Sequence, residues 1–401
     1  MAASQAAAAA AQRNYHSLAS FPTLNLALAH ATGSSSAPTL NGGTSDTFAD
    51  IGDTLDTSGQ RRFQAAGARA QFAAARYQYE ETKVTLTQQI RDAYWSLAAA
   101  RAQTQIAQEG LQDSQRVYQL TQTQFQAGAS PRVDVIRSSI DLANIQQSAV
   151  TARGAERTAL TAFNVLLARP TSTPVDLADQ ITEATVTPAA IPGLPSLAEL
   201  TRRAIAGRPL VLSAKEQLRA AEYALKQARA GRFPDVAVDY QRSLQDPTYS
   251  VLVGIKLPLF DFGSVRNSIK AAEEARKQAQ AQAQQDEQQV TQQVAQAYSD
   301  YTQAQELAKS YQTDILSPSG TLLTSAQIGY QQGATGILPV IDAETTLRNA
   351  RTGYINSLLA LYKAQDELLA ATGELPLPAS APAKSGIPGA GRGAEPPTKE
   401  R

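Results

Sequence analysis

The chain of 401 residues contains no cysteine and only one methionine and one tryptophan. Without a thiol, the sequence excludes disulfides, zinc–thiolate sites, thiol nucleophiles and, in the chain as written, a lipidated cysteine. The formal net charge is zero, because 36 Lys and Arg balance 36 Asp and Glu. The chain therefore has no excess of positive charge that would attract nucleic acid. The two histidines, His16 and His30, stand alone, and no Ser-His-Asp, phosphate-loop or metal-ligand pattern occurs. We therefore expect no enzyme, no cofactor and no metal site.

Long hydrophobic runs are absent as well. No stretch of about 18 apolar residues occurs, which excludes a transmembrane helix. Aromatic residues make up 6% and hydrophobic residues 43% of the chain, which is lean for a globular core of this length. The alanine-rich start has neither a basic flank nor a leucine-rich stretch, so it does not read as a signal peptide.

The sequence contains an internal repeat of one large unit. The octapeptide TQQIRDAY at 87–94 recurs as TQQVAQAY at 291–298, an offset of 298 − 94 = 204 residues. Similar offsets relate Gly59 to Gly263 (263 − 59 = 204) and the glycine of FQAGAS, 125–130, to that of YQQGAT, 330–335 (333 − 128 = 205). Two copies in register predict that each carries half of one architecture.

Each unit predicts the same order of elements: a short helix, two strands, a very long helix, a glycine-containing turn and a shorter helix. Strands are expected at about 24–28, 47–56, 236–240 and 249–259. The last is the clearest, because its apolar residues alternate: Tyr249, Val251, Val253, Ile255, Leu257 and Leu259. Alternation with period two gives one apolar face and one wet face, and the length suits a tilted membrane-spanning strand.

The long helices are expected from just after Gly59 to Gly128 and from just after Gly263 to Gly333. Gly67, Gly110 and the step 318–320 are the candidate sites for a bend. At ~1.5 Å per residue, each would extend on the order of 100 Å. Their faces are rich in Ala and Gln, and small residues permit close helix neighbours while water touches the outer sides. Taken alone, these helices fit a solvated coiled-coil rod equally well.

The strands argue for an oligomer. Four strands with a lipid-suited face cannot stand alone in hydrocarbon, where every backbone N–H and C=O must be paired and an open sheet edge is excluded. Closure takes at least ~8 strands, which means a dimer at minimum and a trimer for twelve. The wet-faced helices would continue the same tube, so the pattern predicts a hollow conduit, part β in a membrane and part α outside it.

At this point the residues carry a resemblance to the TolC-type outer-membrane efflux protein family. The matching features are the doubled unit, a Phe-Pro step before the first strand of each unit (21–22 and 233–234), the strand exit LFDFG at 259–263, and the turn segment 330–347. The resemblance covers about residues 5–377 and rests on order, spacing and doubling rather than on one motif.

The resemblance implies a mixed, mainly α-helical fold with a membrane β part. A long antiparallel α-helical barrel in the periplasm would continue a β-barrel formed by trimerisation, with four strands per chain. Such homotrimers sit in outer-membrane lipid as exit ducts of tripartite efflux pumps or type I secretion systems. Their partners are a periplasmic adaptor protein and an inner-membrane transporter, and no nucleic acid is involved.

Four segments follow from this reading. They are a first repeat over 1–169, a linker over 170–195, a second repeat over 196–377 and a disordered tail over 378–401. The second repeat opens with a helix at 196–206 that has no counterpart in the first. Family members begin with an export signal and that helix, so we expect the chain as written to be truncated at its start.

The glycine-bearing turns match the family's periplasmic tip. Gly128 and Gly333 match its tip glycines, and with their neighbours Ala129 and Ala334 they are expected to dock the adaptor. These neighbours are smaller than in the family pattern. The glycines also fit plain helix C-caps, which is compatible with docking.

Four residues match the family's gate. Asp342 matches a constriction aspartate, of which three copies around an axis would repel one another and attract cations. Asp134 and Tyr330 match a pair that helps hold the tip closed, although an acidic residue in a first helical turn also favours Asp134 without any gate. The family's gating arginine falls on Thr335, so that latch is expected to be weaker or supplied by Arg132 or Arg137; a second ring aspartate falls on Pro339.

Aromatic residues close to the strand ends fit a membrane interface: Phe21, Tyr240, Tyr249 and Phe260. Packing at the junction of strand and helix explains Phe260 equally well. The rival to a duct is a soluble or peripheral coiled-coil scaffold or adaptor without a pore. The alternating strand at 249–259 separates the two readings, because a soluble rod has no use for a lipid-suited face.

Overall fold

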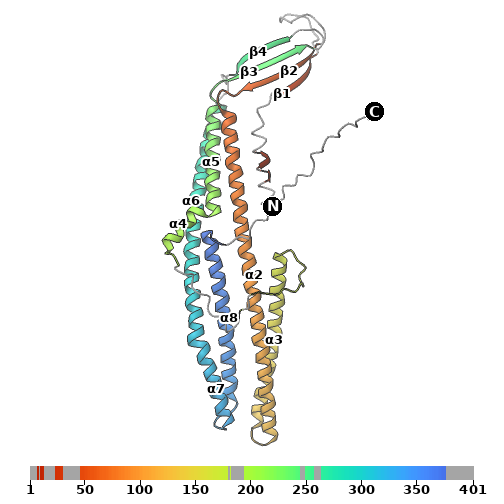
Figure 1. The fold of residues 1–401 in the computed structure, drawn as a ribbon, viewed down its shortest axis with the longest axis vertical. Coiled ribbons are helices and arrows are strands. Elements are labelled where there is room, and N and C mark those ends of the chain that lie inside the picture. The colour runs from red at the N-terminus through yellow and green to blue at the C-terminus, as the bar shows by residue number, and fades with distance from the viewer. Residues whose placement is uncertain are drawn as a thin grey trace, which may run out of the picture.

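The computed structural model shows an elongated molecule with a sheet at one end and bundled helices below it (Figure 1). The structure describes residues 7, 8, 10–12, 23–29, 46–178, 181, 194–243, 249–256 and 263–375. Most of the described chain is helical, as the sequence predicts. None of its helices combines the length and apolar character needed to cross a membrane.

The sheet joins strands from distant parts of the chain. All neighbours are antiparallel and the spatial order is β1 (Thr23–Ala29), β2 (Asp46–Leu55), β3 (Asp235–Ser243) and β4 (Tyr249–Lys256). The four predicted strands are therefore present, and those whose ends are described differ from the expected bounds by a few residues; Leu257 and Leu259, the expected end of the last strand, lie outside the described residues. Strands β1 and β4 form the two edges and have no further neighbour among the described residues.

One face of the sheet is apolar across β3 and β4. The register sets Val236 opposite Ile255, Val238 opposite Val253, and Tyr240 opposite Val251. Paired residues share a face of an antiparallel sheet. The β4 members of this face are exposed in the protomer: Val251 60%, Val253 66% and Ile255 68%. Apolar side chains this exposed in one protomer call for an apolar surrounding.

Between Gln60 and Thr372 the described residues form eight helical segments: α2 (Gln60–Gln126), α3 (Arg132–Leu166), α4 (Leu197–Gly207), α5 (Pro209–Ala230), α6 (Ser264–Ser310), the π-helix η1 (Tyr311–Leu316), α7 (Ser317–Gln331) and α8 (Leu338–Thr372). Helix α2 has 67 residues, so it extends on the order of 100 Å. It runs from the sheet to the far end of the molecule, as expected from the interval between Gly59 and Gly128 (Figure 1). Helices α6, η1 and α7 form the second long run.

The start of α2 is fixed by Asp56, which was expected at the end of the strand at 47–56. The Asp56 carboxylate lies just past β2 and accepts hydrogen bonds from the backbone N–H groups of Gln60 (2.9 Å) and Arg61 (2.7 Å). Burial opposes ionisation of Asp56, but the Ser58 hydroxyl and these N–H groups outweigh it and lower its pKa. Gly59, with φ of 80°, makes the corner that glycine tolerates best.

The candidate bend site at Pro318 is preceded by a register change. Residues 311–316 form the π-helix η1, and Pro318 follows in the first turn of α7. Tyr311 lies against Gly353 of α8, and a Cβ at Gly353 would overlap the tyrosine ring. A π-turn inserts one extra residue per turn, so it shifts the face that α7 presents relative to α6.

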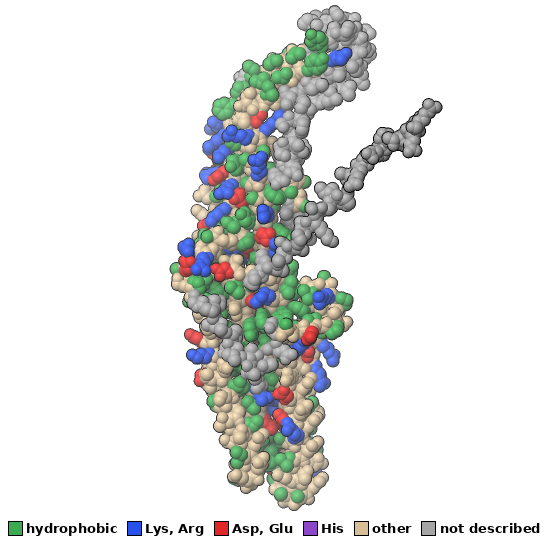
Figure 2. Space-filling view, in the orientation of Figure 1, with side chains coloured by type: hydrophobic (Ala, Val, Ile, Leu, Met, Phe, Trp, Pro, Cys, Tyr) green, Lys and Arg blue, Asp and Glu red, His purple; other side chains and the backbone are tan. Residues whose placement is uncertain are grey.

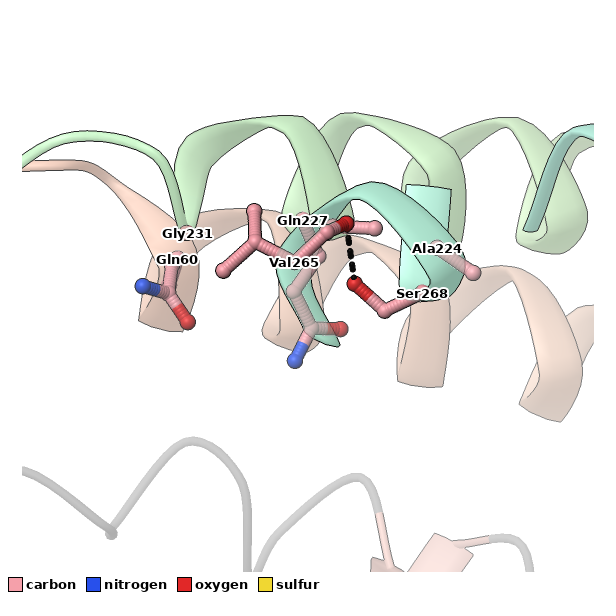
Figure 3. A pocket seen from close by; sticks show the side chains of 7 residues that line it. Gln60, Ala224, Gln227, Gly231, Val265 and Ser268 are labelled. Atoms are coloured by element: carbon pink, nitrogen blue, oxygen red, sulfur yellow. Dashed lines mark hydrogen bonds between the residues drawn. The ribbon is translucent and has the colours of Figure 1, made fainter. Parts of the chain in front are cut away.

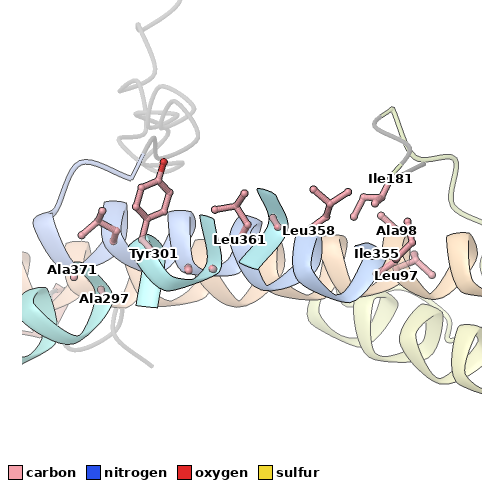
Figure 4. Packing of buried hydrophobic residues seen from close by; sticks show 14 of the residues in the cluster. Leu97, Ala98, Ile181, Ala297, Tyr301, Ile355, Leu358, Leu361 and Ala371 are labelled. Atoms are coloured by element: carbon pink, nitrogen blue, oxygen red, sulfur yellow. The ribbon is translucent and has the colours of Figure 1, made fainter. Parts of the chain in front are cut away.

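The main core lies where α2, α6 and α8 meet, about midway along the helices. Leu97 of α2, Tyr301 of α6, and Ile355 and Leu358 of α8 pack here with almost no exposed surface (Figure 4). Alanines fill much of the remaining contact surface, including Ala98, Ala297, Ala304 and Ala371. Small residues let the helix axes approach, which is how a chain with few aromatics still buries a continuous core.

A charged group is built into this core. Asp366 of α8 is 1% exposed. It pairs with Arg91 of α2 (Nη2 to Oδ1, 2.7 Å) and accepts a hydrogen bond from Trp95 Nε1–H (3.0 Å). The Trp95 ring stacks on Tyr362, with centroids 4.0 Å apart and planes at 11°. Helices α2 and α8 are thus joined by an ion pair, a hydrogen bond and a ring stack within two helical turns.

Helix α3 ends in a strained turn that suggests a stabilising substitution. Ala168 has φ of 53°, which costs a non-glycine residue about 1 kcal/mol. Its N–H bonds to Val165 O (3.0 Å), and the Arg169 N–H bonds to Asn164 O (2.9 Å). We expect Ala168→Gly to raise the free energy of unfolding by about 1 kcal/mol, measured by thermal unfolding in detergent. Ala127→Gly is the control, because Ala127 has φ of −80° and should lose rather than gain stability.

Candidate functional site at the helical tip

Both tip turns are closed by the same hydrogen-bond pattern around a glycine. Gly128 has φ of 75°, and the N–H groups of Gly128 and Ala129 bond to Phe125 O (3.0 Å) and Gln124 O (2.8 Å). Gly333 has φ of 69°, and the N–H groups of Gly333 and Ala334 bond to Tyr330 O (3.0 Å) and Gly329 O (2.9 Å). This is the Schellman arrangement, so both glycines are helix C-caps. Docking at these turns stays a prediction.

The second hairpin contacts the first through Tyr330. The Tyr330 hydroxyl of α7 donates a hydrogen bond to Gln124 Oε1 of α2, 206 residues away in sequence. Burial raises the pKa of Tyr330, and the nearby Asp134 carboxylate raises it further. Asp134 thus lies near enough to Tyr330 to act on it electrostatically, and a role of this pair in holding the tip closed stays a prediction. Gln124 was missed, because nothing in the sequence distinguishes it from the other glutamines of α2.

Asp134 lies in the first turn of α3 and is buried. Its carboxylate accepts a hydrogen bond from the Ser130 hydroxyl (3.3 Å), and the α3 N-terminus favours its negative charge. Both readings of Asp134 from the sequence, a helix-start residue and a partner near Tyr330, are thus compatible with its position.

Thr335 closes its own turn. Its N–H bonds to Gly329 O (3.3 Å), and its hydroxyl oxygen lies 3.1 Å from where a Cβ on Gly329 would stand. Arg132 and Arg137, the expected substitutes for a gating arginine, are exposed on α3. Any role of these three residues in a latch stays a prediction.

Asp342 is exposed on α8, one turn after the helix begins. The next two residues, Ala343 and Glu344, are buried against the rest of the protomer. Asp342 therefore points away from the packed side of α8, which leaves its carboxylate available to a pore axis or to solvent.

A buried charge cluster above the tip was not anticipated from the sequence. Glu344 and Arg348 of α8 face Asp141 of α3, with Arg348 Nη2 3.8 Å from Asp141 Oδ1. The Ser114 hydroxyl of α2 donates to Asp141 Oδ2 (2.7 Å). Gly110 of α2 makes room for Arg348, because a Cβ there would stand 2.7 Å from Arg348 Cδ. The cluster joins all three helices.

Hollows lie along the described helices. A groove of 640 Å³ between α2, α3 and α8 has a lining of mixed polar and apolar side chains that includes Gln103, Asn144, Ile145 and Arg348. A shallow pocket of 220 Å³ near the sheet is lined by Gln60, Gly231 and Val265, whose carbonyl accepts a hydrogen bond from the Ser268 hydroxyl (Figure 3). The linings include serine or threonine hydroxyls but no Asp, Glu or His side chain that could act on them as a base, and the described residues contain no grouping of His, Asp and Glu suited to a metal.

The surface changes character along the molecule. On the face seen in Figure 2, hydrophobic side chains gather on the described part of the sheet end, charged side chains spread over the helices below it, and the tip is mostly uncharged. Tyr240 and Tyr249, two of the expected interface aromatics, stack with centroids 6.4 Å apart. Phe21 and Phe260, the other two, lie outside the described residues.

A four-stranded sheet with an exposed apolar face, continuous with helices of this length, is the subunit architecture of outer-membrane channels. The chain aligns with the outer-membrane channel OprN at 25% sequence identity and a TM-score of 0.76, covering 93% of this chain and 86% of that one. Against CusC, whose structure is described as showing transmembrane channel formation, the TM-score is 0.79 at 21% identity, with 93% and 88% covered.

Comparison of the sequence with known protein families identifies the family of this chain. The model of the outer membrane efflux protein family matches residues 1–169 and 200–374, and the chain belongs to this family. The pyoverdine export outer membrane protein OpmQ of Pseudomonas aeruginosa is 25% identical over 336 residues, which is 80% of this chain and 68% of the relative. The resemblance inferred from motifs is confirmed, and the chain is an outer-membrane protein whose long helices correspond to the periplasmic helical barrel of its relatives.

Proposed function

We propose that the protein is the trimeric exit duct of a tripartite efflux pump or type I secretion system. Three protomers form a water-filled channel through the outer membrane and periplasm, and substrate passes through it passively. Membership of the efflux protein family supports this.

The observation that carries the proposal is the sheet. It exposes an apolar face, which is unfavourable in water, and it leaves β1 and β4 as edges, whose unpaired backbone groups are unfavourable in lipid. Pairing β4 of one protomer with β1 of the next removes the edges. Three copies of four strands close a twelve-stranded barrel with the apolar face turned to lipid.

The tip supplies the gate in this proposal. Asp342, exposed on α8, forms a ring of three carboxylates around the axis that narrows the pore and favours cations. The contacts of Tyr330 with Gln124 and Asp134 hold the two hairpins together, and loosening them opens the tip. Thr335 stands where the family has its gating arginine, so this part of the latch is weaker than in the family or is supplied by Arg132 or Arg137.

The partners are a periplasmic adaptor and an inner-membrane transporter. The adaptor docks on the tip turns around Gly128, Ala129, Gly333 and Ala334. The substrate is set by the transporter rather than by this chain: relatives of similar identity are named for pyoverdine export, cobalt–zinc–cadmium resistance and toluene efflux.

The proposed organisation has two repeats, 1–169 and 196–377, joined by the linker 170–195 and followed by the tail 378–401. Each repeat gives a strand pair and a helical hairpin. The αL glycines that start α2 and α6, Gly59 and Gly263, and those that end α2 and α7, Gly128 and Gly333, support the pairing. The rival, a scaffold without a pore, gives no reason for the exposed apolar face.

The test uses neighbouring residues on opposite faces of β4. Val253 lies on the apolar face and Leu252 on the other, and both are about two thirds exposed in the protomer. Val253→Arg should lose about 2–4 kcal/mol of membrane stability, because it places a charge in lipid. Leu252→Arg, which faces the water-filled lumen, should be tolerated. The readout is the fraction of chain recovered from outer membranes as a threefold detergent-belted particle. A beltless rod, or equal tolerance of both changes, would refute the duct.

A further inference from the structure

Glu344 is a buried carboxyl that neither the fold nor the proposed gate requires. It is 6% exposed and lies on α8 where this helix packs against α2 and α3. Within the described part of the chain, its Oε2 atom has no hydrogen-bond partner. A buried carboxylate oxygen without a partner is costly when ionised and far less costly when protonated.

The charges around Glu344 come from all three helices. Asp113 of α2 and Asp141 of α3 repel an ionised Glu344, whereas Arg116 of α2 and Arg348 of α8 attract it. Both arginines have other acceptors: Arg116 bonds to Asp113, and Arg348 lies 3.8 Å from Asp141. Two carboxylates and two guanidinium groups thus nearly balance without Glu344, and a third carboxylate leaves a surplus negative charge.

Burial and the two aspartates, opposed by the arginines, raise the pKa of Glu344 to about 7. When α8 separates from α2 and α3, Glu344 meets water and its pKa returns to about 4.3. The packed arrangement therefore binds the proton more tightly than the separated one. Packing is most favoured below about pH 4.3, and this advantage is lost as pH rises through about 7.

We propose that Glu344 is a proton-binding site that latches the second hairpin onto the first. Protonated, it holds α8 against α2 and α3 and keeps the tip closed; ionised, it repels Asp113 and Asp141 and loosens the tip. The proton moves between the Glu344 carboxyl and solvent, with no other reactant. That the latch gates a channel rests on the proposed function, whereas the dependence of helix packing on the protonation of Glu344 does not.

The distance between the two tip turns tests the latch directly. Spin labels at Ala129→Cys and Ala334→Cys report this distance within a protomer, and the chain has no native cysteine to interfere. Labelled chains are diluted with an excess of unlabelled chains, so that most of the trimers that contain any label contain a single labelled protomer. We expect the long-distance population to rise severalfold between pH 6 and pH 8.

Glu344→Gln, which mimics the protonated side chain, should keep the short distance at both pH values. Glu306→Gln is the matched control, because Glu306 is exposed on α6 and its change should leave the pH response intact. Asp113→Asn removes a repelling carboxylate, so it should shift the midpoint to lower pH. This variant keeps the test decisive if Glu344→Gln fails to fold.

A wild-type distance that does not change with pH, or an unchanged midpoint in Asp113→Asn, would overturn the latch. Conductance in planar bilayers is measured on the same samples. A distance that titrates in a protein without conductance would keep the latch and reject the duct. Conductance in a protein whose distance between the tip turns does not change with pH would keep the duct and reject the latch.

Discussion

Asp366→Ala is expected to lower the free energy of unfolding by about 3 kcal/mol, the lower end of the range for breaking a buried ion pair. The change leaves Arg91 without its carboxylate and Trp95 Nε1–H without its acceptor. Arg91 is 38% exposed, so water recovers part of the loss and the upper end of the range is not reached. Thermal unfolding followed by far-ultraviolet circular dichroism, in detergent at fixed protein concentration, measures the effect.

Two variants of the same helical turn serve as controls for Asp366. Asp366→Asn keeps an oxygen that accepts from Trp95 but removes the charge that pairs with Arg91, so it should fall between wild type and Asp366→Ala. Glu367→Ala removes an exposed neighbouring carboxylate and should change stability by less than about 0.5 kcal/mol. If Asp366→Ala and Glu367→Ala had the same free energy of unfolding, the ion pair would contribute nothing measurable to stability.

Leu358→Ala is expected to cost about 2–5 kcal/mol, because it opens a cavity at the centre of the main core. Leu358 has no exposed surface and packs among α2, α6 and α8 (Figure 4). Its neighbours are held by long helices that cannot collapse locally, which favours the upper half of that range. Denaturant unfolding at constant detergent concentration gives the value.

Leu86→Ala is the matched change for Leu358, since Leu86 is 45% exposed on α2. It removes the same atoms without leaving an enclosed cavity, so its cost should stay near 1 kcal/mol. Equal losses for the two leucines would mean that the helices relax around Leu358 or that Leu86 is buried against another protomer. Unfolding at several protein concentrations separates these two causes.

The extended and helical elements were predictable because their signals are local. The alternation of apolar residues at 249–256 predicts both the strand and its two faces. Helix α2 begins and ends beside Gly59 and Gly128, which adopt the left-handed conformation that favours glycine. The step at Pro318 was a candidate site for a bend, but the π-helix that precedes it was not expected. A register change of this kind depends on the packing of Tyr311 against Gly353, which the sequence does not encode locally.

The tip shows where sequence reasoning stops. Asp342 and Glu344 are two residues apart, so they lie on opposite sides of a helix. The sequence predicts this opposition, but which side packs against α2 and α3 depends on the rotation of α8 in the bundle. The contact between Tyr330 and Gln124 likewise joins residues 206 positions apart, and no local pattern gives such a pairing.

The single tryptophan makes one junction of this long molecule optically visible. Trp95, stacked on Tyr362 and bonded to Asp366, is the only residue of its kind in the chain, so its fluorescence reports on the α2–α8 contact alone. An opening confined to the tip would leave its emission maximum unchanged. An opening that slides α8 along the whole length of α2 would expose the indole to water and shift its emission to longer wavelengths.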